Sequence, residues 1–267
     1  MALLETHSLS MSFGGLKAIS DLDFAVERGA VHGLIGPNGS GKSTFFNLVT
    51  GVYRANPGSV IRFDGVDTTK LDAHKIAALG VARTFQLLRL FSEMTVLDNL
   101  LVGYHVHVPY SLVAPILRPR YVRKCDAEAR DEMLELLSFV GLEEFAEMPA
   151  GELSGGQRRL LSLGRAIAMR PKLLMLDEPA AGLSPTNVDS LMGIVLNLKD
   201  RYGLTLLIVE HILKVVMDTC DTVTVLDHGH KIGEGAPAEV KDDPAVIEAY
   251  LGKEMSDDEV RAAFARA

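Results

Sequence analysis

The sequence lacks features that define several large classes of protein. No run of about 18 apolar residues occurs, so no segment is expected to span a membrane. The first residues lack the charged and apolar regions of a signal peptide. Only two cysteines occur, Cys125 and Cys220. Their spacing does not fit a metal site, so both are expected to be free thiols in a reducing compartment.

Basic surface charge and internal repetition are also scarce. The formal net charge is −8 at pH 7, and no basic stripe alternates with aromatic residues. Because proteins that bind nucleic acid depend on such basic surfaces, nucleic acid is not expected as a partner. No internal repeat is visible. The chain has 267 residues, a length that fits one large domain or two small ones.

The most informative stretch is residues 33–44, which fits the phosphate-loop pattern G-x-x-x-x-G-K-[ST] without a mismatch. Glycines leave backbone N–H groups open to phosphate oxygens, Lys42 can place a charge beside the β- and γ-phosphates, and the Ser43 hydroxyl can bind Mg²⁺. The expected nucleotide contacts are Gly36, Pro37, Asn38, Gly39, Ser40, Gly41, Lys42, Ser43 and Thr44. A glycine-rich turn without a ligand is the alternative. An apolar strand pattern before the loop and an apolar helix pattern after it favour the phosphate site.

The segments on either side of this loop predict β-structure. Residues 3–4, 9–11 and 22–26 have the pattern of short strands, and Asp64-Gly65 is a hairpin signal. An antiparallel piece is therefore expected beside the nucleotide core. Phe13 could stack on an adenine ring, although the residues alone favour a core residue at a hairpin corner.

A helical insertion into the α/β core is predicted for residues 95–141. It starts with a capping-box-like Thr-Val-Leu-Asp, and helical spacing of apolar residues resumes over 124–140. Between them, residues 104–123 contain three prolines and predict a long loop or broken helix. His105 and His107 in this segment are expected to be solvated rather than metal ligands, because no carboxylate or cysteine lies nearby.

Another helix is predicted to begin after Ser154, which forms a capping box with Gln157. Gly155 and Gly156 in its first turn are poor helix formers. They are understandable if a phosphate group must approach this helix end closely. An ordinary capped helix is the alternative.

Two predicted buried strands end in polar residues. The apolar run 173–176 leads into Asp177 and Glu178. One carboxylate could hold Mg²⁺ and the other could orient or deprotonate a water molecule, with a surface acidic turn as the alternative. His211 follows the predicted strand 204–209, and open α/β sheets place ligand-facing groups at such strand ends, although a lone His is usually structural.

Together these motifs resemble the nucleotide-binding subunit of an ATP-binding cassette (ABC) transporter over residues 1–252, with 253–267 as a C-terminal tail. The Leu-Ser-Gly-Gly-Gln motif at residues 153–157 separates this family from other phosphate-loop ATPases. The resemblance implies an α/β fold. It would have a phosphate-loop, RecA-like core, an antiparallel β subdomain and a helical subdomain inserted at about residues 91–164.

The resemblance also implies a role for each motif residue. Glu178 would be the general base, His211 would contact the γ-phosphate and Asp177 would hold the magnesium shell. Gln86 would touch both Mg²⁺ and the attacking water. Phe13 would stack on adenine, which reverses the preference drawn from the residues alone.

The family's dimeric arrangement assigns the second glycine motif. Each ATP would lie between the phosphate loop of one subunit and the second glycine motif of the other, which consists of Ser154, Gly155, Gly156 and Gln157. Ser184 stands where the family commonly has Asp. The cross-dimer contact of that loop is therefore not carried over to this chain.

Four stretches, at residues 13–18, 82–86, 94–100 and 233–237, are similar to the larger ATP-binding subunit of branched-chain amino acid importers. This resemblance implies ATP and Mg²⁺ as cofactors, and a position at the cytoplasmic face of the inner membrane. The implied partners are a second, identical or different ATPase subunit, two permeases and, indirectly, a periplasmic binding protein. Urea or amide importers and a lipopolysaccharide exporter are the nearest rivals. A soluble non-transport ABC ATPase and a regulatory module without hydrolysis are less favoured.

Overall fold

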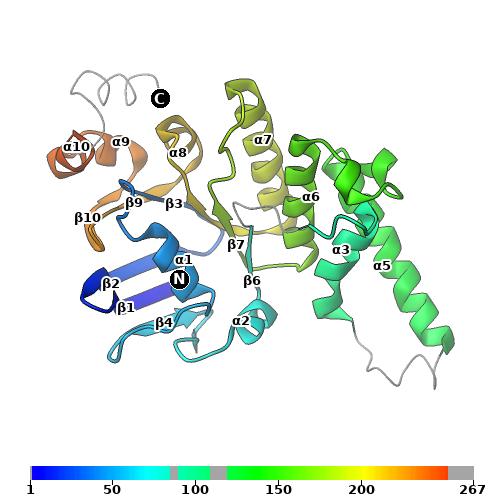
Figure 1. The fold of residues 1–267 in the computed structure, drawn as a ribbon, viewed down its shortest axis with the longest axis horizontal. Helices are drawn as coiled ribbons and strands as arrows, with labels where there is room; N and C mark the ends of the chain where they lie inside the picture. Colours follow the sequence, from blue (N-terminus) through cyan, green and yellow to red (C-terminus); the bar gives the residue numbers. More distant parts are fainter. Residues whose placement is uncertain (1, 85–89, 109–118, 252–267) are drawn as a thin grey trace. The chain divides into compact units, whose positions relative to one another are not determined.

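The computed structural model describes residues 2–84, 90–108 and 119–251. The chain forms two compact units (Figure 1). The core unit consists of residues 1–86 and 172–267, and the helical unit consists of residues 87–171. Within the described residues, no helix combines the length and the apolar character that crossing a bilayer requires.

One sheet of the core unit is antiparallel and has the order β2-β1-β4-β5. Its strands are β1 (Ala2–Phe13), β2 (Leu16–Glu27), β4 (Val60–Phe63) and β5 (Val66–Asp67). The prediction of an antiparallel piece with a hairpin at Asp64-Gly65 is confirmed, because β4 pairs with β5 across that turn. The short strands predicted over residues 3–26 are wrong in extent. Register shifts interrupt the β1–β2 pairing and with it the apolar alternation, so two long strands look broken in the sequence.

The second sheet has six strands in the order β10-β9-β3-β8-β7-β6. Its strands are β3 (Val31–Ile35), β6 (Val81–Arg83), β7 (Leu173–Asp177), β8 (Thr205–Val209), β9 (Thr222–Asp227) and β10 (His230–Gly235). All neighbours from β9 to β6 pair in parallel, and only β10 runs antiparallel to β9. The carboxyl ends of β3, β7 and β8 therefore meet at one edge, where α/β sheets place their ligands.

The helices of the core unit are α1 (Lys42–Val49), α2 (Ala73–Leu79), α7 (Pro185–Tyr202), α8 (Leu213–Thr219), α9 (Pro237–Lys241) and α10 (Pro244–Leu251). Helix α1 contributes to a core that includes residues of both sheets. Phe45 and Phe46 are fully buried there, together with Phe63 of the antiparallel sheet and Leu207 of the parallel sheet. Burying each phenylalanine contributes roughly 1.5–3 kcal/mol, so α1 and the loop before it are firmly held.

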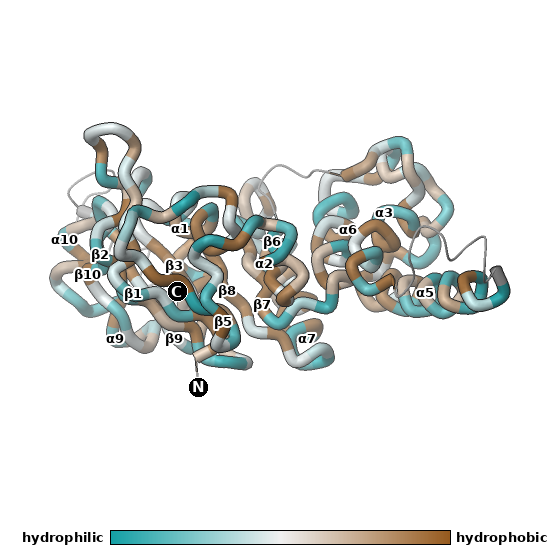
Figure 2. Tube along the Cα trace, turned by 90° about the horizontal axis from the view of Figure 1, so that it is seen from below, coloured by the Kyte–Doolittle hydropathy of each residue, from teal (hydrophilic) through white to brown (hydrophobic). Residues whose placement is uncertain are grey.

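The helical unit contains α3 (Val96–Tyr104), α5 (Pro119–Phe139), α6 (Gly155–Ala168) and the short 3-10 helices η1 (His105–His107), η2 (Glu143–Phe145) and η3 (Ala150–Glu152). The tube of α5 carries both teal and brown stretches, as a helix with one apolar face does (Figure 2). Residues 119–123 belong to α5, so this helix begins five residues before the predicted restart at residue 124. Pro119 is the first residue of this helix, a position where proline is well tolerated.

Candidate functional site

The phosphate-loop motif connects β3 to α1, in the order that the sequence predicts. Two of its glycines are required by the geometry. Gly36 has φ +147°, and a Cβ atom there would lie 2.0 Å from the carbonyl oxygen of Leu226. Gly41 has φ +110°, and its Cβ would lie 2.6 Å from the carbonyl oxygen of Ala18. Any other residue at these positions would clash with backbone and adopt a left-handed conformation that L-residues rarely adopt.

Lys42 is the first residue of α1, and its side chain folds back over the loop. It is only 6% exposed, and its Nζ donates to the carbonyl oxygens of Gly36 at 2.7 Å and Pro37 at 2.9 Å. Burial lowers the pKa of Lys42, while the negative charges of Glu178 and Asp177 act in the opposite direction. The ammonium group is thus held close to the loop and to two carboxylates.

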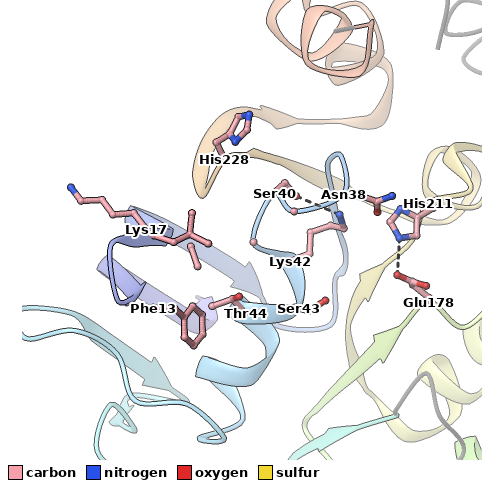
Figure 3. Close-up of a pocket in the computed structure, with 14 residues that line it drawn as sticks. Phe13, Lys17, Asn38, Ser40, Lys42, Ser43, Thr44, Glu178, His211 and His228 are labelled. Carbon is pink, nitrogen blue, oxygen red and sulfur yellow. Dashed lines mark hydrogen bonds and ion pairs between the residues drawn. The ribbon is translucent and has the colours of Figure 1, made fainter. Parts of the chain in front are cut away.

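A pocket of about 360 Å³ lies beside this loop, and all its lining residues belong to the core unit. Residues 38–44 form one part of its wall, and Glu178 and His211 form another. Figure 3 shows Phe13 beside Thr44 and, on the other side of Lys42, His211 beside Glu178. The structure therefore brings together residues that are more than 190 positions apart in the sequence.

Phe13 ends β1 and is 44% exposed, so it is not the core residue that the sequence alone favours. Its ring meets Tyr53 edge to face, with 5.4 Å between the ring centroids. The ring lines the pocket on the same side as Thr44. An exposed, braced aromatic ring at a pocket wall can stack on a planar ligand.

Glu178 follows β7 directly and has φ +49°, a left-handed conformation that is uncommon outside glycine. Its amide donates to the carbonyl oxygen of Val209, the last residue of β8, at 2.9 Å. Its Oε1 lies 2.6 Å from Nε2 of His211. This contact joins the ends of two adjacent strands and orients the Glu178 carboxylate at the edge of the pocket.

Asp177 is the last residue of β7, and its carboxylate is already paired. One oxygen, Oδ2, accepts from Arg83 of β6 at 2.6 Å, and the same guanidinium donates to Oδ1 of Asn47 on α1 at 2.7 Å. The two charged side chains are 9% and 11% exposed. The Arg83 guanidinium also lies 5.3 Å from the ring centroid of Phe46. Asp177 is therefore fixed between the sheet and the helix that carries Lys42.

His228 is a pocket residue that sequence reasoning missed. It sits in the turn between β9 and β10, where the amide of Gly229 donates to the carbonyl oxygen of Ser40 at 2.9 Å. No local pattern marks this residue. Its position depends on a turn near residue 229 docking against the phosphate loop, which sequence spacing does not reveal.

The second glycine motif opens α6 in the helical unit. The predicted capping box is present: the Ser154 amide donates to Oε1 of Gln157 at 2.9 Å, and the Gln157 amide donates to Oγ of Ser154 at 3.3 Å. A Cβ atom on Gly155 or Gly156 would meet nothing within 4 Å. The chain's own packing thus does not require glycine at either position. Gln86 lies outside the described residues.

Comparison with known proteins identifies the family. A family profile described as "ABC transporter" matches residues 19–181, which is more than half of the chain. The chain belongs to the ABC transporter family. A second profile, described as "Branched-chain amino acid ATP-binding cassette transporter", matches residues 230–256. The recognition made from the sequence motifs is therefore confirmed.

Two curated ABC proteins illustrate the similarity. The chain is 43% identical to the high-affinity branched-chain amino acid transport ATP-binding protein BraF of Pseudomonas aeruginosa, over 94% of this chain and 98% of BraF. It is 38% identical to the corresponding protein LivG of Escherichia coli K12, again over 94% and 98% of the two chains.

A solved ABC structure shows the same fold. The ADP conformation of MJ1267, an ATP-binding cassette of an ABC transporter, is 36% identical and superposes with a TM-score of 0.81, covering 95% of this chain and 100% of that one. This confirms the predicted α/β fold with an antiparallel β subdomain. As a member of the ABC family, the chain has a nucleotide-binding domain, and the pocket beside the phosphate loop is the candidate nucleotide site.

Proposed function

We propose that this chain is the ATP-hydrolysing, energy-coupling subunit of an importer for branched-chain amino acids. The observation that carries the proposal is the 43% identity to BraF along almost the full length of both chains. The match of residues 230–256 to the branched-chain amino acid profile supports the same solute class from a region outside the shared ABC motifs.

The geometry of the pocket supports ATP as the nucleotide. In the proposed pose, Phe13 stacks on adenine and residues 36–44 surround the phosphates with backbone amides, the α1 N-terminus and Lys42. The hydroxyl of Ser43 and the carboxylate of Asp177, joined by Gln86, are oxygen donors of the kind that Mg²⁺ prefers. When bound, Mg²⁺ would neutralise charge on the phosphate oxygens.

Hydrolysis needs a water molecule that attacks the γ-phosphorus as the bond to the bridging oxygen breaks, giving ADP and phosphate. Glu178 is proposed to accept the proton of this water, and its carboxylate lines the pocket for that purpose. His211 holds Glu178 through the 2.6 Å contact and would also touch the γ-phosphate. Gln86 is proposed to help position the water.

A second cassette is proposed to complete the site. Ser154, Gly155, Gly156 and Gln157 would meet the ATP held by the partner, either a copy of this chain or a related subunit. The open space around both glycines supports this role, because a bulky phosphate could reach the start of α6. ATP binding would then close the dimer, and hydrolysis would reopen it.

The remaining assignments concern the assembly. We infer that residues 1–252 form one ABC domain with a helical subdomain at about 91–164, and that 253–267 form a tail. The helical subdomain would transmit closure to two permease subunits at the cytoplasmic face of the inner membrane, with a periplasmic binding protein delivering the solute.

Lys42→Ala should weaken ATP binding by roughly 10- to 100-fold, because a hydrogen bond to a charged group contributes about 1.5–3 kcal/mol. Equilibrium titration with a fluorescent ATP analogue measures the affinity. Lys75→Ala removes an exposed lysine of α2 in the same unit and should leave the affinity unchanged. Wild-type affinity in the Lys42 variant would contradict the phosphate-loop assignment.

The transport role is tested by purifying tagged Glu178→Gln protein from detergent-solubilised native membranes with ATP present, followed by mass spectrometry. Recovery of two polytopic permeases and a second cassette subunit is expected, and radiolabelled leucine uptake in a deletion strain then tests the solute. Permeases of a urea, amide or lipopolysaccharide system would replace the solute assignment. Recovery of ribosomal or DNA-bound proteins without a permease would overturn the transport role.

A further inference from the structure

Glu210 is a buried carboxylate that the proposed mechanism does not use. It directly follows β8 and is only 2% exposed. Its Oε1 accepts from the amide of Ala180 at 2.6 Å, and its Oε2 accepts from the amides of His211 at 3.1 Å and Ile212 at 3.5 Å. One side chain thus binds the backbone of two separate loops.

These two loops carry the pair at the edge of the pocket. Ala180 lies two residues after Glu178, in the loop between β7 and α7, and His211 lies in the loop between β8 and α8. The side chains of Glu178 and His211 meet at 2.6 Å, and Glu178 has a left-handed φ of +49°. A left-handed non-glycine residue persists only where its surroundings fix it. The Glu210 carboxylate supplies fixed contacts on both sides of this pair.

The chemistry of the contact favours a carboxylate. Burial raises the pKa of Glu210, the three backbone N–H groups lower it, and the charge of Glu178 raises it. Burying this group costs free energy that only good hydrogen bonds offset. An amide in its place would turn an N–H₂ group toward one of the loop amides, so glutamine cannot satisfy both loops.

We propose that Glu210 is a positioning residue that holds the loops after β7 and β8 together and so keeps the side chains of Glu178 and His211 correctly placed for hydrolysis. This inference rests on the proposed ATPase function. Glu210 does not line the pocket, so it acts through the two loops and not on the nucleotide.

The test uses the full-length chain with Glu210→Gln. ATP turnover should fall roughly 10- to 100-fold, as misplacing catalytic groups by about 1 Å does, while KM and ATP affinity stay within about twofold of wild type. Asp221→Asn is the matched control. Its carboxylate also accepts a hydrogen bond from a backbone amide, that of Val31 at 2.7 Å. Val31 is the first residue of β3, so this contact lies at the end of the strand away from the phosphate loop. Turnover should stay near wild type in the control.

Measuring turnover in a double variant distinguishes a positioning role of Glu210 from a general structural effect. In a His211→Ala background, Glu210→Gln should cost much less than in the wild type, because the pair it aligns is already broken. Equal losses in both backgrounds would overturn the proposal. Unchanged turnover in the single variant would overturn it as well, and so would a parallel loss of ATP affinity.

Amide hydrogen exchange tests the clamp without catalysis. Glu210→Gln should speed exchange at Ala180 and His211 roughly tenfold or more, since a hydrogen bond to a charged group is lost, and Asp221→Asn should not. Unchanged exchange in both loops would overturn the inference. Absence of ATP hydrolysis in the wild type would instead contradict the proposed function and leave the exchange result to decide whether the clamp exists.

Discussion

Glu178→Gln is expected to lower ATP turnover by roughly 10²- to 10⁴-fold, the usual contribution of a positioned general base, while ATP still binds. Glutamine has nearly the same shape and can keep a polar contact with His211, but it cannot take a proton from water. Single-turnover hydrolysis measured beside equilibrium ATP binding separates the chemical step from affinity.

Glu248→Gln provides the control for this substitution. It makes the same chemical change on α10, where Glu248 is exposed, and should leave turnover at the wild-type value. If Glu178→Gln hydrolysed ATP at the wild-type rate, another group would have to act as the base. A loss of ATP binding equal to the loss of turnover would also remove Glu178 from that role.

Arg83→Met is expected to destabilise the core unit by about 3–5 kcal/mol, because it leaves the Asp177 carboxylate buried without its partner. The two side chains are 9% and 11% exposed, so water replaces little of the lost interaction. Methionine keeps an apolar side chain beside Phe46, but it removes the hydrogen bond to Asn47 and the cation–π contact together with the ion pair. Urea unfolding followed by circular dichroism measures the free energy of unfolding.

The double variant Arg83→Met, Asp177→Leu separates the cost of an unpaired charge from the cost of altered packing. Replacing both partners by apolar residues of similar size should restore most of the lost stability, because no charge then remains buried. A single variant within about 0.5 kcal/mol of wild type, the range of ordinary surface substitutions, would show that solvent reaches Asp177 after all.

The parts of the site that the sequence predicts are those encoded by a few adjacent residues. The phosphate loop follows from glycine spacing, and the Ser154 capping box follows from a four-residue pattern that the structure confirms. Both depend on local backbone geometry. For the same reason the sequence identifies Asp177 and Glu178 as a pair of carboxylates at a strand end, but it does not identify the residues that they contact.

The parts that it does not predict depend on pairing between distant segments. Arg83 and Glu210 read as ordinary charged residues, and only the alignment of β6, β7 and β8 turns them into contacts of Asp177 and of the loops. His228 reaches the pocket through a turn that docks on Ser40. Phe13 could not be judged from its own neighbours, because its exposure is set by how β1 ends against Tyr53.

The position of β3 in the sheet has a consequence for synthesis on the ribosome. This strand carries the phosphate loop and ends at Ile35, yet its two neighbours, β8 and β9, end at Val209 and Asp227. At roughly 5–20 residues per second, ribosomes need about 10–40 s to make the intervening chain. Residues 87–171, which are continuous in sequence, can fold during that interval. Until then β3 lacks both of its neighbouring strands, so we expect the nucleotide pocket to be among the last parts of the protein to form.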